Sequence, residues 1–117
     1  MCVLAGGRCA VSYDVYLSVD AGGPEPVSLP LDWNYTSNCA CMWDAAGAPI
    51  RDFHGKRAGD CASLLADAIA TMEREPERFI AMNPPNGWGS YESLLPRLRV
   101  LLEAFRNAPN AIVEVSR

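Results

Sequence analysis

The chain lacks most of the features that usually reveal what a protein does. Its 117 residues include a single histidine and no excess of basic residues, and the formal net charge is −4 at pH 7. This charge argues against nucleic acid, because sequence-independent binding to phosphates needs a basic surface. No stretch approaches the roughly 20 consecutive apolar residues of a membrane span. We therefore expect neither nucleic acid nor a membrane as a partner.

Neither a targeting segment nor a disulfide framework is expected. The first eleven residues contain one charge, Arg8, and no extended apolar stretch, which argues against a secretory signal. The five cysteines are Cys2, Cys9, Cys39, Cys41 and Cys61. This odd number, without an export signal, argues for reduced thiols. We therefore expect a cytoplasmic protein.

What the chain does contain is an ordinary globular composition. Half of its residues are apolar and 21% are charged, and a chain of this length is typical of one domain. About two thirds of the surface of the unfolded chain should become buried at this size, which is enough for one hydrophobic core. We predict a flexible N-terminal extension over residues 1–9 and a single α+β domain over residues 10–117.

Strand patterns occur near both ends of the chain. Apolar and polar residues alternate from Ala10 to Val19, which is the period of a half-buried strand, and Ala111–Val115 is a closing strand. Val27–Leu31 predicts a weaker strand, which Pro26 and Pro30 confine to a sheet edge because proline cannot donate to the ladder. We expect the first and last strands to be neighbours in a small antiparallel or mixed sheet.

Two amphipathic helices are predicted between these strands. The first begins after an Asp60 N-cap and ends before Pro76, with apolar residues at helical spacing. The second is capped by Ser90 or Ser93. A shorter helix is expected over Cys39–Ala46. The two main helices should cover one face of the sheet, giving a two-layer α+β fold.

The most distinctive segment is the loop Met82–Glu92. It combines two prolines, two asparagines, two glycines and two aromatic residues, a composition typical of a rigid turn. Tryptophan and tyrosine are enriched where binding energy concentrates. The candidate partner-binding residues are therefore Trp88, Tyr91 and Asn86. The alternative is that Trp88 packs against the last helix.

Two polar segments are candidates for binding a small molecule or an anion. Their residues are Asn34, Thr36 and Asn38 in the first segment, and His54, Lys56 and Arg57 in the second. Short polar side chains bond to their own backbone in turns, or they line a pocket that reads a ribose or base edge. The basic second segment precedes a helix, whose free N–H groups favour an anion. A solvated loop is the alternative there.

Specific metal and catalytic motifs are missing from the sequence. A Cys₃His zinc site built from Cys39, Cys41, His54 and Cys61 would need an unusual Cys-x-Cys spacing. Cys61 also falls on the apolar face of its helix, where cysteine acts as a small hydrophobe. Nothing marks an oriented base or an oxyanion hole for a cysteine nucleophile. We expect no metal, no cofactor and no catalytic residue.

Several segments share their order with a known group of proteins. They are Tyr13-Asp14-Val15-Tyr16-Leu17, Asn34-Tyr35-Thr36-Ser37-Asn38, Gly59-Asp60-Cys61-Ala62 with the Leu64-Leu65 helix, and Asn83-Pro84-Pro85-Asn86-Gly87-Trp88-Gly89 with its helix. In these segments the chain resembles small uncharacterised proteins of actinobacterial phages and prophages. The resemblance covers most of the chain from Tyr13 onward. It implies an accessory protein that binds a component of the host cell, and it assigns no catalytic residue.

The leading hypothesis from the sequence is a non-catalytic phage or prophage accessory protein. It would bind a host protein, with a defence component as one candidate, in the cytoplasm of the host cell. The alternative is a protein that binds or sequesters a nucleotide-like small molecule. An exposed edge strand at Val27–Leu31 would also favour a homodimer.

Overall fold

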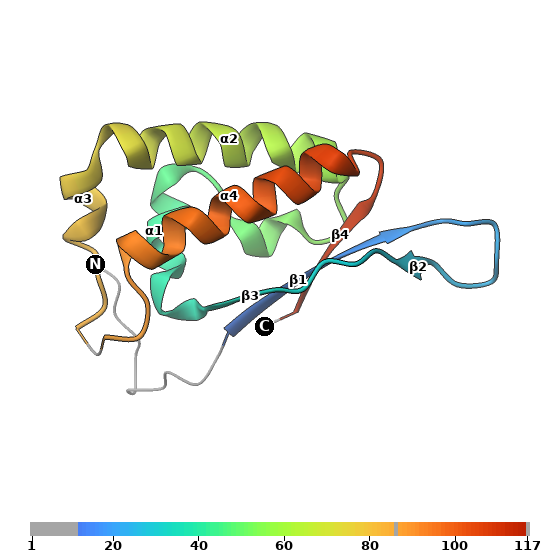
Figure 1. Cartoon of the computed structure of the whole chain (residues 1–117), viewed down its shortest axis with the longest axis horizontal. Helices are drawn as coiled ribbons and strands as arrows, with labels where there is room; N and C mark the ends of the chain where they lie inside the picture. The colour runs from blue at the N-terminus through green and yellow to red at the C-terminus, as the bar shows by residue number, and fades with distance from the viewer. Residues whose placement is uncertain (1–11, 86, 117) are drawn as a thin grey trace.

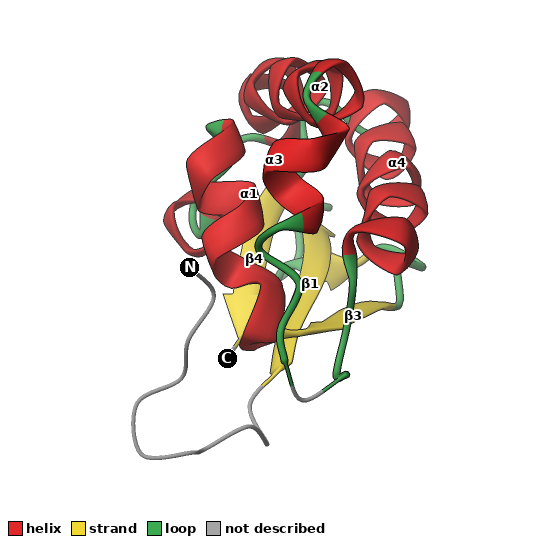
Figure 2. Ribbon diagram, turned by 90° about the vertical axis from the view of Figure 1, so that its left-hand side faces the viewer, coloured by secondary structure: helices red, strands yellow, loops and turns green. Residues whose placement is uncertain are grey.

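The computed structural model describes residues 12–85 and 87–116, which form an α+β fold with one small sheet. In chain order its strands and α-helices are β1 (Ser12–Val19), β2 (Val27–Ser28), β3 (Trp33–Thr36), α1 (Ala40–Ala46), α2 (Ala58–Arg74), α3 (Pro76–Ile80), α4 (Tyr91–Asn107) and β4 (Ile112–Ser116). The 3₁₀ turns η2 (Ser37–Cys39) and η3 (Ile50–Phe53) flank α1. Figures 1 and 2 show the helices gathered on one side of the sheet. The predicted two-layer α+β fold is confirmed.

β1 is the central strand of the sheet. It pairs antiparallel with β4 on one edge, and with β3 and then β2 along the other edge. The first and last strands are therefore neighbours, as predicted, and the sheet is antiparallel. The strand predicted over Val27–Leu31 is shorter in the structure, where β2 covers Val27–Ser28. One further bond joins the N–H of Leu29 to the carbonyl of Leu17 at 2.8 Å, and Pro30 then has no N–H to extend the ladder.

The hydrophobic core lies between the sheet and the helices. Tyr13, Val15 and Leu17 of β1 are buried, whereas Tyr16 on the opposite face is 43% exposed. α2 and α4 each bury one stripe of side chains, as their apolar spacing predicts. The largest fully buried side chains include Trp33, Trp43, Phe53, Phe79, Phe105, Leu65, Leu94 and Leu98. This core positions both the segment that leads into α2 and the loop that leads into α4.

The segment before α2 covers the outer edge of β4. The N–H of Gly55 donates to the carbonyl of Val113, and the N–H of Val113 donates to the carbonyl of Lys56, each at 2.8 Å. α2 follows directly and begins at Ala58. The predicted Asp60 N-cap is therefore wrong, because pairing with β4 fixes where the helix starts. Asp60 lies in the first turn instead, where a carboxylate is favoured by the helix dipole.

α4 begins with a capping box. The hydroxyl oxygen of Ser90 accepts from the N–H of Ser93 at 3.2 Å, and the hydroxyl oxygen of Ser93 accepts from the N–H of Ser90 at 3.3 Å. Pro96 lies inside this helix, where proline removes one backbone bond. The helix nevertheless continues to Asn107, because buried side chains such as Leu98 anchor the following turns.

The β1–β2 hairpin projects beyond the helices at one end of the molecule (Figure 1). None of the helices in residues 12–85 and 87–116 is long and apolar enough to cross a bilayer. The extension proposed for residues 1–9 lies outside the described residues. In Figure 1 the projecting hairpin is the part of the described chain that the helical layer covers least.

Candidate functional site

Residues 81–85 and 87–90 belong to the connection between α3 and α4, and we refer to these described residues as the Trp88 loop. Its backbone turns at Gly87 and Gly89, whose φ angles are 76° and 94°. Such positive angles strain residues other than glycine. The N–H of Gly87 donates to the carbonyl of Pro84 at 3.3 Å, which closes the turn. The glycines therefore shape a tight connection at the start of α4.

Gly89 also lets the loop lie directly against β3 and η2. A Cβ atom at this position would stand 2.7 Å from Thr36 Cγ2, 3.0 Å from Cys39 Sγ and 3.2 Å from the Tyr35 hydroxyl oxygen. The first of these distances is well below the contact distance of two carbon atoms. Because Gly89 has no side chain, the loop can lie in contact with β3 and η2, which are distant from it in the sequence.

Side-chain amides hold the loop at both ends. Asn38, which is buried, donates from Nδ2 to the carbonyl oxygen of Trp88 at 3.3 Å. The Asn83 Oδ1 atom accepts from the N–H of Tyr91 at 2.8 Å. Both bonds use backbone groups of the loop or of the helix start, so they fix the main chain around Trp88.

The Tyr35 hydroxyl joins β3 to the start of α4. It accepts from the N–H of Ser90 at 3.1 Å and is hydrogen-bonded to the hydroxyl of Ser93. Burial raises the pKa of the Tyr35 hydroxyl above its usual value, and the bonds to Ser93 and Ser90 oppose this shift. The hydroxyl therefore stays protonated at neutral pH and serves as a neutral anchor.

Trp88 is presented to solvent by this anchored backbone. It is 62% exposed, whereas Trp33 and Trp43 are 1% and 0% exposed. Packing of Trp88 against the last helix, the alternative derived from the sequence, would require a largely covered ring. The structure instead places the indole at the surface, where a partner could contact it.

The other two candidate partner-binding residues have different outcomes. Tyr91 is only 9% exposed, and its hydroxyl donates to the carbonyl of Met72 on α2 at 2.8 Å. The expectation that Tyr91 is a surface anchor is therefore wrong. Tyr91 is the first residue of α4, and its side chain is buried because it reaches α2. Asn86 lies outside the described residues.

The first polar segment supports the fold. Asn34 donates from Nδ2 to Asp14 Oδ1 at 2.6 Å across the β1–β3 pair. The hydroxyl oxygen of Thr36 accepts from the N–H of Asn38 at 3.3 Å and caps η2. The Thr36 contact agrees with the turn interpretation, whereas Asn34 lies in β3 and bonds across the sheet to β1. The sequence did not reveal that Asn38 reaches the carbonyl of Trp88, 50 residues away.

The second polar segment lies at the opposite edge of the sheet. His54 Nδ1 accepts from the N–H of Val115 at 3.0 Å, and Arg57 donates to Asn110 Oδ1 at 2.5 Å. Lys56 is exposed and bonds to β4 through its carbonyl. β3 and β4 flank β1 on opposite edges. The two polar segments therefore do not converge into one pocket.

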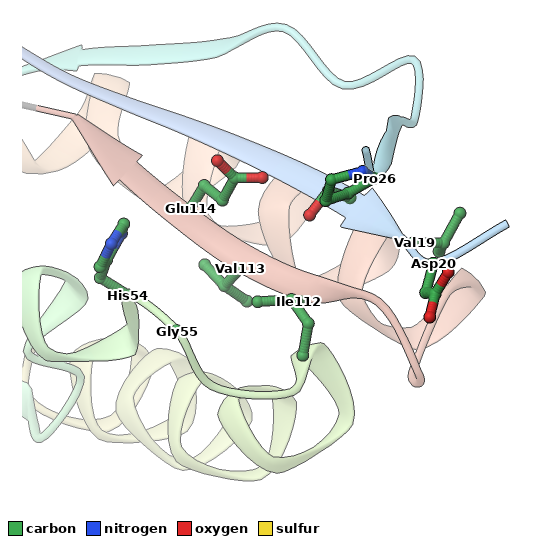
Figure 3. A pocket seen from close by; sticks show the side chains of 9 residues that line it. Val19, Asp20, Pro26, His54, Gly55, Ile112, Val113 and Glu114 are labelled. Carbon is green, nitrogen blue, oxygen red and sulfur yellow. The ribbon is translucent and has the colours of Figure 1, made fainter. Parts of the chain in front are cut away.

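A groove of about 350 Å³ lies beside His54 (Figure 3). Its lining comes from β1, β4, the segment that joins β1 to β2 and the segment before α2, and its apolar side chains are those of Val19, Pro26, Ile112 and Val113. The other ionisable residues in its lining are Asp20 and Glu114, and neither Lys56 nor Arg57 contributes. Because two carboxylates accompany one imidazole, the groove does not favour the anion that the basic segment suggested.

The described cysteines are not arranged as a reactive or metal-binding site. Cys39 and Cys61 are free and buried, and burial raises the pKa of each thiol to about 11. Both are therefore protonated and unreactive at neutral pH. Cys41 is disulfide-bonded, which corrects the expectation of reduced thiols, since an odd count still permits one bridge. Within residues 12–85 and 87–116, no cluster of His, Cys, Asp or Glu could hold a metal ion.

Similarity to known proteins offers no further guide to function. Comparisons of the chain with protein-family models, with curated proteins and with solved structures find no match in any of the three. The Trp88 loop is therefore the feature of the described chain from which function is best argued.

Proposed function

We propose that the protein is a non-catalytic binding protein whose Trp88 loop makes the central contact with a protein partner. The observation that carries this proposal is the exposure of Trp88 on a backbone held by Asn38 and by the close approach at Gly89. Tryptophan is enriched among the residues that dominate interface energies. A loop that is already ordered also loses little conformational entropy on binding.

The partner we propose is a protein of a bacterial host cell, with a component of the host's defence as the first candidate. This part of the proposal is supported by the resemblance to proteins of actinobacterial phages and prophages. A net charge of −4 also suits a protein partner better than a nucleic acid. The protein would act by occupying a surface of its partner.

Affinity capture from an actinobacterial lysate, followed by binding measurements on the purified partner, tests this proposal. Trp88→Ala should weaken binding about thirtyfold, because an interface residue of this kind contributes about 2 kcal/mol. The variant leaves the glycines and the main-chain hydrogen bonds of the loop in place. Leu64→Ala is the matched control, since Leu64 is an apolar residue of α2 that is 44% exposed.

The two variants separate the possible outcomes. The Leu64→Ala variant should bind as the wild type does, and both variants should give wild-type circular dichroism spectra. Equal affinity of the wild type and Trp88→Ala for the captured protein would contradict the proposal. An equal loss of affinity in both variants would also contradict it, because the contact would then not be centred on the loop.

A nucleotide-like small molecule is the second candidate ligand. The specific observation in its favour is the groove of about 350 Å³ beside His54, since pockets of this size hold small ligands. A thermal-shift series with nucleotides tests it, because a ligand present at a hundred times its Kd adds about 2.7 kcal/mol of stability. The carboxylates of Asp20 and Glu114 make this the weaker of the two proposals.

A further inference from the structure

The outer edge of β4 is covered in two different ways. Near its start, the backbone of residues 55 and 56 pairs with Val113 through two bonds of 2.8 Å. One ladder position further along, the partner of the strand is a side chain, because the N–H of Val115 donates to His54 Nδ1 at 3.0 Å. The imidazole thus takes the place of a backbone carbonyl where the neighbouring segment turns away.

This contact requires one protonation state of the ring. A neutral imidazole has one nitrogen that accepts and one that donates, so an accepting Nδ1 places the proton on Nε2. The imidazolium ion carries protons on both nitrogens and cannot accept. Histidine is the side chain whose charge normally changes between about pH 5 and pH 8.

We propose that His54 is a pH-sensitive cap on the edge of β4. The neutral ring holds the N–H of Val115, and the protonated ring releases it. Release leaves a backbone donor exposed at a strand edge and puts a positive charge beside the groove of Figure 3. An exposed donor of this kind is what natural sheets keep covered, because it can pair with another extended chain.

Several titratable and charged residues accompany His54 in the groove and in its own segment. Glu114 of β4 and Asp20 at the end of β1 line the same groove, and Tyr16 of β1 is paired with Glu114. Within its own segment, Asp52 precedes His54 by two positions and Lys56 follows it by two. The imidazolium donates at both nitrogens and no longer accepts, and the charged side chains that share the groove with it, Asp20 and Glu114, are both carboxylates.

Amide hydrogen exchange followed by NMR tests the proposal at a single residue. The protection factor of the Val115 amide should fall about fivefold between about pH 8 and pH 5, the effect of losing one hydrogen bond of ordinary strength. The amide of Val113 is the internal control, because its bond to the carbonyl of Lys56 does not depend on the imidazole. Its protection should stay constant over the same range.

Two substitutions distinguish the cap from general loosening of the strand. His54→Asn keeps an acceptor, because its Oδ1 stands where Nδ1 stands along the side chain, and it does not titrate; Val115 should remain protected at both pH values. His54→Ala has no acceptor, so the protection of Val115 should be about fivefold below that of the wild type at pH 8, and it should be the same at both pH values. Equal protection of Val115 in the wild type at both pH values would overturn the proposal, as would wild-type protection in His54→Ala.

Discussion

Trp88 and Gly89 are adjacent residues with opposite environments. Trp88 is largely exposed, while Gly89 lies so close to Thr36 and Cys39 that a side chain would overlap them. The contact at Gly89 fixes the backbone from which the indole projects. At the scale of the residue, the Trp88 loop depends on a glycine that meets two separate requirements, a positive φ angle and the absence of a Cβ atom.

Substitution of the two loop glycines separates these requirements. Gly89→Ala should lower the free energy of unfolding by about 2–4 kcal/mol, because it adds left-handed strain and overlap with Thr36 Cγ2. Gly87→Ala is the matched control, with a φ angle of 76° and no atom within 4 Å of the added Cβ. It should cost only about 1 kcal/mol of backbone strain. Urea denaturation measures both, and equal losses would show that the approach at Gly89 is not close.

The sequence could not separate Trp88 from Tyr91. Both are aromatic residues of one loop and both carry the signal of an interface residue. The structure exposes Trp88 and buries Tyr91, because α2 lies beside the start of α4 and offers the carbonyl of Met72 to the Tyr91 hydroxyl. The position of α2 is a tertiary fact that a local pattern does not contain.

Elements with a strict apolar period are the part of the fold that the sequence predicts best. The alternation along β1 from Ser12 to Leu17 and the helical spacing along α2 and α4 match the buried faces in the structure, and the alternation fails only at the end of β1, where Ser18 is buried. Their ends are less predictable, because contacts with distant residues set them. α2 starts at Ala58 since the preceding residues pair with β4, and α4 tolerates Pro96 since its buried face extends on both sides.

The buried stripe of α2 can be tested with two neighbouring leucines. Leu65 is 0% exposed and Leu64 is 44% exposed. Leu65→Ala should lower the free energy of unfolding by about 2–4 kcal/mol, because it removes buried methyl groups and leaves a cavity. Leu64→Ala should change it by less than about 0.5 kcal/mol, as is usual at a surface position. Chemical denaturation of both variants measures this, and similar losses would mean that another face of α2 is buried.

At the scale of the whole molecule, strand order decides which residues can meet. The protein is elongated, with axis extents of 46, 31 and 19 Å, and the Trp88 loop and the β1–β2 hairpin lie toward opposite ends (Figure 1). The two polar segments lie on opposite edges of the sheet, because β1 separates β3 from β4. The sequence could not predict that the two polar segments lie on opposite edges, since the strand patterns do not specify which edge of β1 each neighbouring strand takes.

Acrylamide quenching of tryptophan fluorescence most directly tests the central claim, that the protein presents Trp88 to solvent from a fixed loop. The chain has three tryptophans, and Trp33 and Trp43 are buried in the core. We predict that the wild type has a strongly quenched component and that this component disappears in Trp88→Phe, leaving weakly quenched emission. An unchanged quenching curve in Trp88→Phe would show that the indole is covered, which would contradict the proposed contact surface.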